Sequence, residues 1–136
     1  MDTKELVVDT TLRRLVDLTG DMEEFCEGRG NGLVLAFCPH ATAALVLMER
    51  GAGSEQDLVA WIDAQLPRAD SYRHRHGPLG HGRDHLLPAL FGSSVSVPVR
   101  SGVPLLGTWQ SVLLLDTNEE NNRRQVLFSF LGAGPD

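Results

Sequence analysis

Short runs of hydrophobic residues, separated by polar segments, recur along the whole chain. Most runs are rich in valine, leucine and other apolar residues and are too short for helices, which is typical of strands. The pattern predicts strands at residues 5–18, 33–38, 43–48, 95–99, 112–115 and 125–131. The polar segment 116–122 predicts a turn between the last two strands.

A smaller number of segments place hydrophobic residues at helical intervals of three and four. They predict two helices and a short third one, which begin near Thr19, Ser54 and His85 and end before Gly28, Pro67 and Gly92. Asp21 and Ser54 are candidates for capping free amides at the starts of their helices. Pro88 is compatible with the first turn of the third helix. Residues 68–84 are polar and rich in Gly, His and Arg, so a long loop is expected there.

Length and charge narrow the classes of protein to consider. A chain of 136 residues and 14.8 kDa has room for one domain, residues 1–136. Its net charge of −6 argues against nucleic-acid binding, which usually requires a basic surface. No apolar segment approaches the roughly 20 residues that span a bilayer, and no secretory signal begins the chain, so a cytoplasmic protein is expected. Cys26 and Cys38 are expected to be small buried hydrophobes rather than a disulfide.

Four of the five histidines lie within twelve residues, in and directly after the predicted loop, where arginines lie between them. These residues are His74, His76, His81, His85, Arg73, Arg75 and Arg83. Neutral imidazole binds transition metals and carries protons near neutral pH. Asp84 could be a further metal ligand, or it could accept a hydrogen bond from a histidine that binds the metal. The arginines favour a small phosphorylated substrate. The alternative is a solvated surface loop whose arginines pair with Asp70 and Asp84, because the spacing matches no specific metal motif.

Three further segments combine side chains that could take part in chemistry. His40 and Thr42 follow a predicted strand, but no third member of a nucleophilic triad is adjacent. Trp109 could stack on a ring while Gln110 reads its polar edge, or Trp109 could be a core residue. Glu49 could be a base in a site or a solvated carboxylate. No Walker loop or GxGxxG precedes a helix, which excludes the simplest nucleotide-binding sites.

Several segments occur in an order that is similar to one known family. They are Asp17-Leu18-Thr19, Gly32-Leu33-Val34, Pro39-His40-Ala41-Thr42-Ala43-Ala44-Leu45, Glu49, Asp57-Leu58, Tyr72-Arg73-His74, His85-Leu86, Gly92-Ser93-Ser94, Val97-Pro98-Val99, Leu106-Gly107-Thr108-Trp109-Gln110, Arg124 and Gly132. In this order they resemble the YjbQ-like family of small proteins, described as secondary thiamine-phosphate synthases. The chain departs from the family pattern at Ala41, His81, Asp84 and Glu120-Asn121-Asn122.

The resemblance implies a compact α+β domain, mostly antiparallel sheet or sandwich with two to three helices, that assembles as a homotrimer. It also implies a polar pocket near the subunit contacts. The catalytic residues implied by matching positions are His40, Glu49, His74 and His85. The implied substrate-binding residues are Thr42, Tyr72, Arg73, Trp109 and Gln110.

The resemblance implies a site of three imidazoles that would hold a divalent metal or an anion. His40, His74 and His85 would be the metal ligands, and Glu49 would be a base or a further ligand. Three neutral imidazoles with an open coordination position favour zinc. Magnesium prefers oxygen ligands and would instead accompany a diphosphate substrate.

The activity implied by the resemblance is thiamine-phosphate synthesis. An aminopyrimidine diphosphate would lose pyrophosphate, and the nitrogen of a thiazole phosphate would capture the pyrimidine cation. The loop arginines would hold the leaving group, while Trp109 or Tyr72 would stack on the ring. In each case the expected partner is a small anionic or phosphorylated metabolite. The alternatives are metal-assisted hydrolysis of a phosphorylated or acyl substrate and a trimer that binds a metabolite or metal without catalysis.

Overall fold

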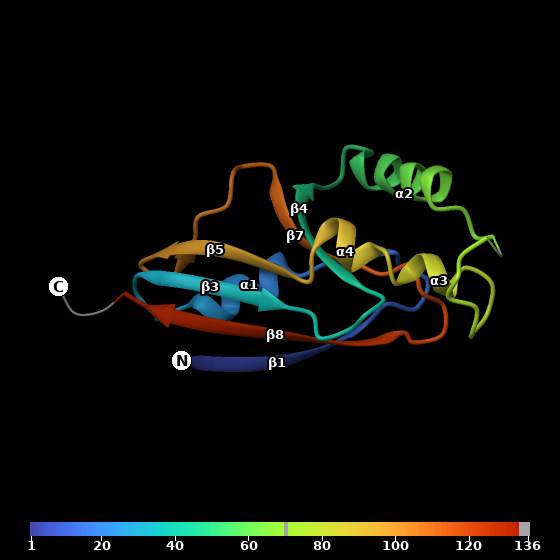
Figure 1. The fold of residues 1–136 in the computed structure, drawn as a ribbon. Helices are drawn as coiled ribbons and strands as arrows, with labels where there is room; N and C mark the ends of the chain where they lie inside the picture. The colour runs from blue at the N-terminus through green and yellow to red at the C-terminus, as the bar shows by residue number, and fades with distance from the viewer. Residues whose placement is uncertain (70, 134–136) are drawn as a thin grey trace.

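The structure is a computed structural model that describes residues 1–69 and 71–133. The strands form two sheets (Figure 1). The larger sheet has the strand order β1-β8-β3-β5-β6, and the smaller has the order β2-β7-β4. The strands are β1 (Asp2–Asp9), β2 (Leu15–Asp17), β3 (Gly32–Phe37), β4 (Ala44–Glu49), β5 (Ser94–Arg100), β6 (Val103–Pro104), β7 (Gln110–Leu115) and β8 (Arg123–Gly132). The helices within the described residues are α1 (Thr19–Cys26), α2 (Ser54–Gln65), α3 (His81–Asp84) and α4 (Leu87–Phe91). All these strand pairings are antiparallel, which confirms the expected α+β fold.

The single strand predicted at residues 5–18 is wrong. The structure divides this segment into β1 and β2, which belong to different sheets. Leu12 between them has a φ of 60°, so the chain turns sharply there. The buried Thr10 hydroxyl donates a hydrogen bond of 2.8 Å to Asp116 Oδ2, which anchors the turn against the end of β7. The sequence pattern does not indicate the break, because β-forming residues continue on both sides of it.

The three predicted helices are confirmed as α1, α2 and α4, but the predicted side-chain caps are not. Neither Asp21 nor Ser54 caps its helix, and α2 begins after Gly53, which has a φ of 100°. At α1 the carboxylate of Asp17 instead accepts the Thr19 backbone N–H at 2.9 Å. The predicted loop 68–84 contains one further helical turn, α3.

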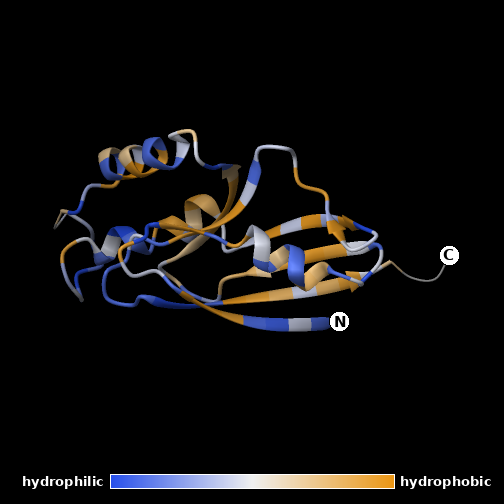
Figure 2. Ribbon diagram, turned by 180° about the vertical axis from the view of Figure 1, so that it is seen from behind, coloured by the Kyte–Doolittle hydropathy of each residue, from blue (hydrophilic) through white to orange (hydrophobic). Residues whose placement is uncertain are grey.

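The main core lies between the larger sheet, α1 and the smaller sheet. Apolar side chains of β3 and β8 point alternately into this core and toward the opposite face of the sheet. The hydrophobic residues of the larger sheet are orange in Figure 2. The Phe128 ring of β8 stacks on Phe25 of α1 with centroids 5.9 Å apart. A second cluster packs α2 and α4 against the smaller sheet, and its buried members are Ala44, Ile62, Leu87 and Leu115. This second cluster therefore fixes both ends of the histidine-rich loop.

The opposite face of the larger sheet carries several partly exposed apolar side chains, and no other segment of the described chain covers them. Leu33 of β3 and Leu131 of β8 are direct partners in the sheet and are 38% and 51% exposed. Phe37 lies further along the same face of β3 and is 40% exposed. Paired, partly exposed hydrophobic residues on one sheet face are typical of a surface that another protein chain covers.

Cys26 and Cys38 are buried free thiols, as expected. Burial raises the pKa of the Cys38 thiol to about 11, so this thiol is neutral at physiological pH and is a poor nucleophile. Among residues 1–69 and 71–133, no helix has both the length and the apolar character needed to cross a membrane.

Gly32 lies where the backbone of β8 leaves no room for a side chain. A Cβ there would lie 2.1 Å from the Leu131 carbonyl oxygen and 2.8 Å from Phe130 Cζ. We expect Gly32→Ala to lower the free energy of unfolding, measured by urea denaturation, by about 1–3 kcal/mol, the usual cost of overpacking. Gly20→Ala in α1 is the control: its Cβ meets no atom within 4 Å. A gain of about 0.5–1 kcal/mol is expected for it. Equal effects of the two substitutions would contradict this close approach.

Candidate functional site

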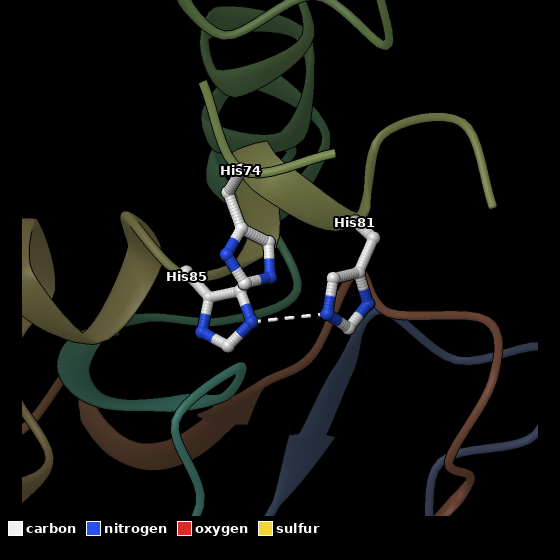
Figure 3. Close-up of side chains that lie close together, drawn as sticks. All are labelled: His74, His81 and His85. Atoms are coloured by element: carbon white, nitrogen blue, oxygen red, sulfur yellow. Dashed lines mark hydrogen bonds between the residues drawn. The ribbon is translucent and has the colours of Figure 1, made fainter. Parts of the chain in front are cut away.

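Three histidine side chains converge where the loop after α2 meets α3 (Figure 3). His74 lies on the loop, His81 begins α3, and His85 follows its last residue. One ring nitrogen from each of the three lies within 4.8 Å of the others. His81 and His85 are four positions apart, so a helical turn places them on one face, with their Nε2 atoms 3.0 Å apart.

Glycines allow the loop to fold back onto α3. Gly80, with a φ of 89°, directly precedes α3 in the left-handed region that favours glycine. At Gly82 a Cβ would lie 2.8 Å from the His74 carbonyl oxygen and 2.8 Å from Tyr72 Cβ. Because Gly82 has no side chain, the segment 72–74 lies directly on α3. This packing brings the His74 ring to the other two.

A carboxylate supports the histidine cluster from the loop between β7 and β8. Glu120 Oε1 contacts Nδ1 of His81 and also accepts a hydrogen bond of 3.3 Å from Asn118 Nδ2. The hydrogen bond with His81 is the main cause that lowers the pKa of Glu120. Partial desolvation, followed by the nearby imidazoles, lowers the pKa of His74, which favours the neutral ring that a metal requires.

The donor set fits a zinc ion better than a magnesium ion. Three imidazole nitrogens converge, whereas magnesium is normally held by oxygen atoms. Zinc–nitrogen bonds are about 2.0–2.1 Å long, so ligand nitrogens around one zinc lie about 3–3.5 Å apart. The Nε2 atoms of His81 and His85 are already 3.0 Å apart, and the three ring nitrogens all lie within 4.8 Å of one another. A histidine–carboxylate contact of the kind seen at His81 is also common behind zinc ligands.

Of the three metal ligands implied by the resemblance, the chain brings together His74 and His85. His40 lies outside their cluster, and its Nε2 accepts the Gln125 backbone N–H at 2.9 Å. Burial, and then the Arg124 charge, lower the pKa of His40. The third member of the cluster is His81 instead.

The other predicted site residues are distributed over separate parts of the fold. Thr42 is buried and accepts a hydrogen bond of 3.0 Å from Arg124 Nη2. Glu49 is the sheet partner of Gln110, where β4 ends and β7 begins, and Figure 1 shows this end of the smaller sheet away from α3. Trp109 is 75% exposed, so the alternative of a core residue is wrong within this chain. Gln110 Oε1 accepts the Gly107 N–H at 2.8 Å, which uses this acceptor within the turn.

The charged residues of the histidine loop divide into exposed and buried groups. Arg73 and Arg75 are exposed, and Tyr72 donates its hydroxyl to the Pro67 carbonyl oxygen at 2.9 Å. Arg83 is fully buried, donates to Asp63 at 2.8 Å, and is therefore not a surface cation for substrate. Asp84 is buried and accepts hydrogen bonds from Thr117 and Asn118. Asp70, the other expected partner of the arginines, lies outside the described residues.

Comparison with known proteins identifies the family. The family model for UPF0047, YjbQ-like proteins matches residues 4–133. The UPF0047 protein Rv2556c of Mycobacterium tuberculosis is 55% identical, with 96% of this chain and 98% of that protein covered. A YbjQ-like protein of unknown function from Sulfolobus solfataricus is 29% identical with a TM-score of 0.88, covering 97% of each chain. A hypothetical protein from Aeropyrum pernix is 31% identical with a TM-score of 0.87, covering 98% of this chain and 100% of that one.

These names correct the expected activity. They give a family number or describe a protein of unknown or hypothetical function, and none of them names a thiamine-phosphate synthase. The assignment of thiamine-phosphate synthesis from the sequence is therefore wrong on these comparisons. The family itself is confirmed by the match over nearly the whole chain. The chain belongs to the UPF0047, YjbQ-like family.

Proposed function

We propose that this protein binds a divalent transition-metal ion, with zinc as the best fit, through His74, His81 and His85. The observation that carries the proposal is the convergence of one nitrogen from each ring within 4.8 Å. The absence of a side chain at Gly82 lets segment 72–74 pack on α3, which places His74 beside the other two histidines. Three nitrogen ligands and one remaining coordination position are typical of zinc sites that bind a further small ligand.

We propose that the further ligand is a small anion or phosphorylated metabolite. A small pocket of about 110 Å³ lies beside the cluster, and its lining includes Tyr72, His74, Arg75 and His76. This volume suits a small anionic group, and the Arg75 guanidinium supplies a permanent positive charge and paired donors. An anion at this position would lie next to the site of the metal.

The metal content of purified variants tests the proposed site. Protein prepared without chelator, loaded with zinc and desalted is expected to hold one zinc per chain by elemental analysis. His74→Ala, His81→Ala and His85→Ala each remove one of the three ligands and are expected to reduce zinc to the background level. Unchanged zinc in these variants, or none in the natural protein, would overturn the proposal.

His40→Ala is the matched control, because it removes an imidazole that lies outside the cluster. We expect this variant to keep its zinc. Loss of zinc from it would contradict the ligand set His74, His81 and His85 and would favour the set implied by the family resemblance.

We also propose that the protein is a cytoplasmic homotrimer. The uncovered apolar face formed by Leu33, Phe37 and Leu131 supports self-association, and two free thiols suit a reducing compartment. Sedimentation is expected to give three times the chain mass of 14.8 kDa. Leu131→Glu would place a charge on this face, so this variant is expected to sediment as a smaller species. A monomeric natural protein would overturn the assembly.

A further inference from the structure

We infer that Glu120 is a positioning residue that sets the orientation and tautomer of the His81 imidazole. This inference rests on the proposed metal site, because it assigns the atom with which His81 would bind the metal. Glu120 contacts Nδ1 of His81, while Nε2 on the other side of the ring lies 3.0 Å from Nε2 of His85. The two nitrogens of His81 therefore have different neighbours and different tasks.

The chemistry of the contact fixes the proton on one nitrogen. An ionised carboxylate only accepts hydrogen bonds, so a neutral His81 must carry its proton on Nδ1, facing Glu120. The lone pair is then on Nε2, which faces the cluster. This is the tautomer that binds a metal through Nε2, and the carboxylate increases the basicity of that nitrogen.

Glu120 is itself held in place by the polar turn that follows β7. Asn118 donates through Nδ2 to Glu120 Oε1 at 3.3 Å and to Asp84 Oδ2 at 3.1 Å. Thr117 donates to the other oxygen of Asp84 at 2.7 Å. Asp84 is buried at the end of α3, directly before His85.

These contacts join the turn to both ends of α3. Asp84 holds the turn near His85, and Glu120 reaches back to His81 at the start of the same helical turn. Asn118, which donates to both carboxylates, therefore couples the position of Glu120 to that of the buried Asp84. Contacts of this kind around a ligand residue are what a preorganised site requires.

Variants of Glu120 test the inference through two measurements, the tautomer of His81 and the affinity for zinc. In metal-free protein at about pH 8, where imidazoles are neutral, nitrogen NMR is expected to show the Nδ1–H tautomer of His81. Glu120→Ala is expected to shift His81 toward the Nε2–H tautomer and to weaken zinc binding, measured by chelator competition, about 10–100-fold. Glu120→Gln keeps an acceptor oxygen, so this variant is expected to retain most of the Nδ1–H tautomer and most of the affinity.

Glu119→Gln is the matched control. Glu119 is adjacent in sequence, its side chain is 75% exposed, and it lies 3.6 Å from Arg68. This variant changes the same charge in the same turn and is expected to behave as the natural protein in both readouts. A thermal unfolding curve for each variant separates a local effect from a general loss of folding.

The outcomes distinguish this inference from the proposed function. If the natural protein binds no zinc but Glu120→Ala still changes the His81 tautomer, the proposed metal site fails and the positioning role stands. If Glu120→Ala leaves the tautomer unchanged, the positioning role is overturned whether or not zinc binds. If Glu120→Gln loses as much zinc affinity as Glu120→Ala while keeping the tautomer, Glu120 is a direct ligand and the positioning role is also overturned.

Discussion

Replacing Arg124 with Met is expected to lower the free energy of unfolding by about 3–5 kcal/mol, because it leaves the buried Asp116 carboxylate without its charged partner. Both residues are almost inaccessible, with exposures of 1% and 3%. Arg124 donates from Nε and Nη2 to the two Asp116 oxygens at 2.7 and 2.9 Å. This bidentate geometry is the strongest form of a charged hydrogen-bonded pair. Urea denaturation of the natural protein and the variant measures the difference.

An exposed ion pair provides the control for Arg124. Lys4 and Glu24 lie 3.6 Å apart with side chains 44% and 71% exposed. We expect Lys4→Met to change stability by less than about 1 kcal/mol, since water screens such pairs. Asp116→Asn in the Arg124→Met background removes the unpaired charge and is expected to recover part of the loss. If Arg124→Met lowers the free energy of unfolding no more than Lys4→Met does, the Arg124–Asp116 pair is not buried in solution.

The Arg124–Asp116 pair matters because its hydrogen bonds reach two segments that are distant in the chain. Asp116 follows β7 and accepts the Thr10 hydroxyl from the turn between β1 and β2. Arg124 in β8 also donates to Thr42, just before β4. The pair therefore ties the larger sheet to the smaller one. Arg124→Met therefore removes a hydrogen-bond partner from both Asp116 and Thr42.

The elements of the fold follow from local sequence patterns, but their assembly does not. Apolar runs correctly predict most strands, because a buried strand needs an unbroken hydrophobic face. The same signal does not show the break at Leu12. Leucine is apolar whether it lies in a strand or, as here, in a turn with a positive φ. Likewise, the polar turn at residues 116–122 predicts a connection without showing that β7 and β8 join different sheets. Sheet membership depends on distant partners such as Asp116 and Arg124.

The candidate site could be predicted only in part for a similar reason. The histidine-rich loop is visible in the sequence, and the four-residue spacing of His81 and His85 would have indicated a shared helical face. Glu120 is 39 residues from His81, and nothing in its local sequence indicates the contact. His81, Asp84 and Glu120 are three of the positions at which the chain departs from the family pattern. The structure shows them in one network linked by Asn118.

Phe128→Ala is expected to lower the free energy of unfolding by about 3–5 kcal/mol, the usual cost of truncating a fully buried aromatic ring. Phe128 is 0% exposed in β8, the strand that lies between β1 and β3. Its ring fills the space between the larger sheet and α1, where it stacks on Phe25 at an interplanar angle of 29°. Closely packed sheets and helices collapse poorly around a lost ring, so a cavity would remain. Chemical denaturation provides the measurement.

Two further variants show whether the loss arises from this packing. Phe128→Leu fills most of the same volume and is expected to lose less than half as much stability as Phe128→Ala. In a double-mutant cycle, Phe25→Ala and Phe128→Ala are expected to couple by about 0.5–1.5 kcal/mol, because the second truncation removes a stacking contact that the first has already broken. Strictly additive effects would mean that the two rings do not touch in solution. The position of α1 on the larger sheet would then have to be different, because Phe25 and Phe128 form its direct aromatic contact with β8.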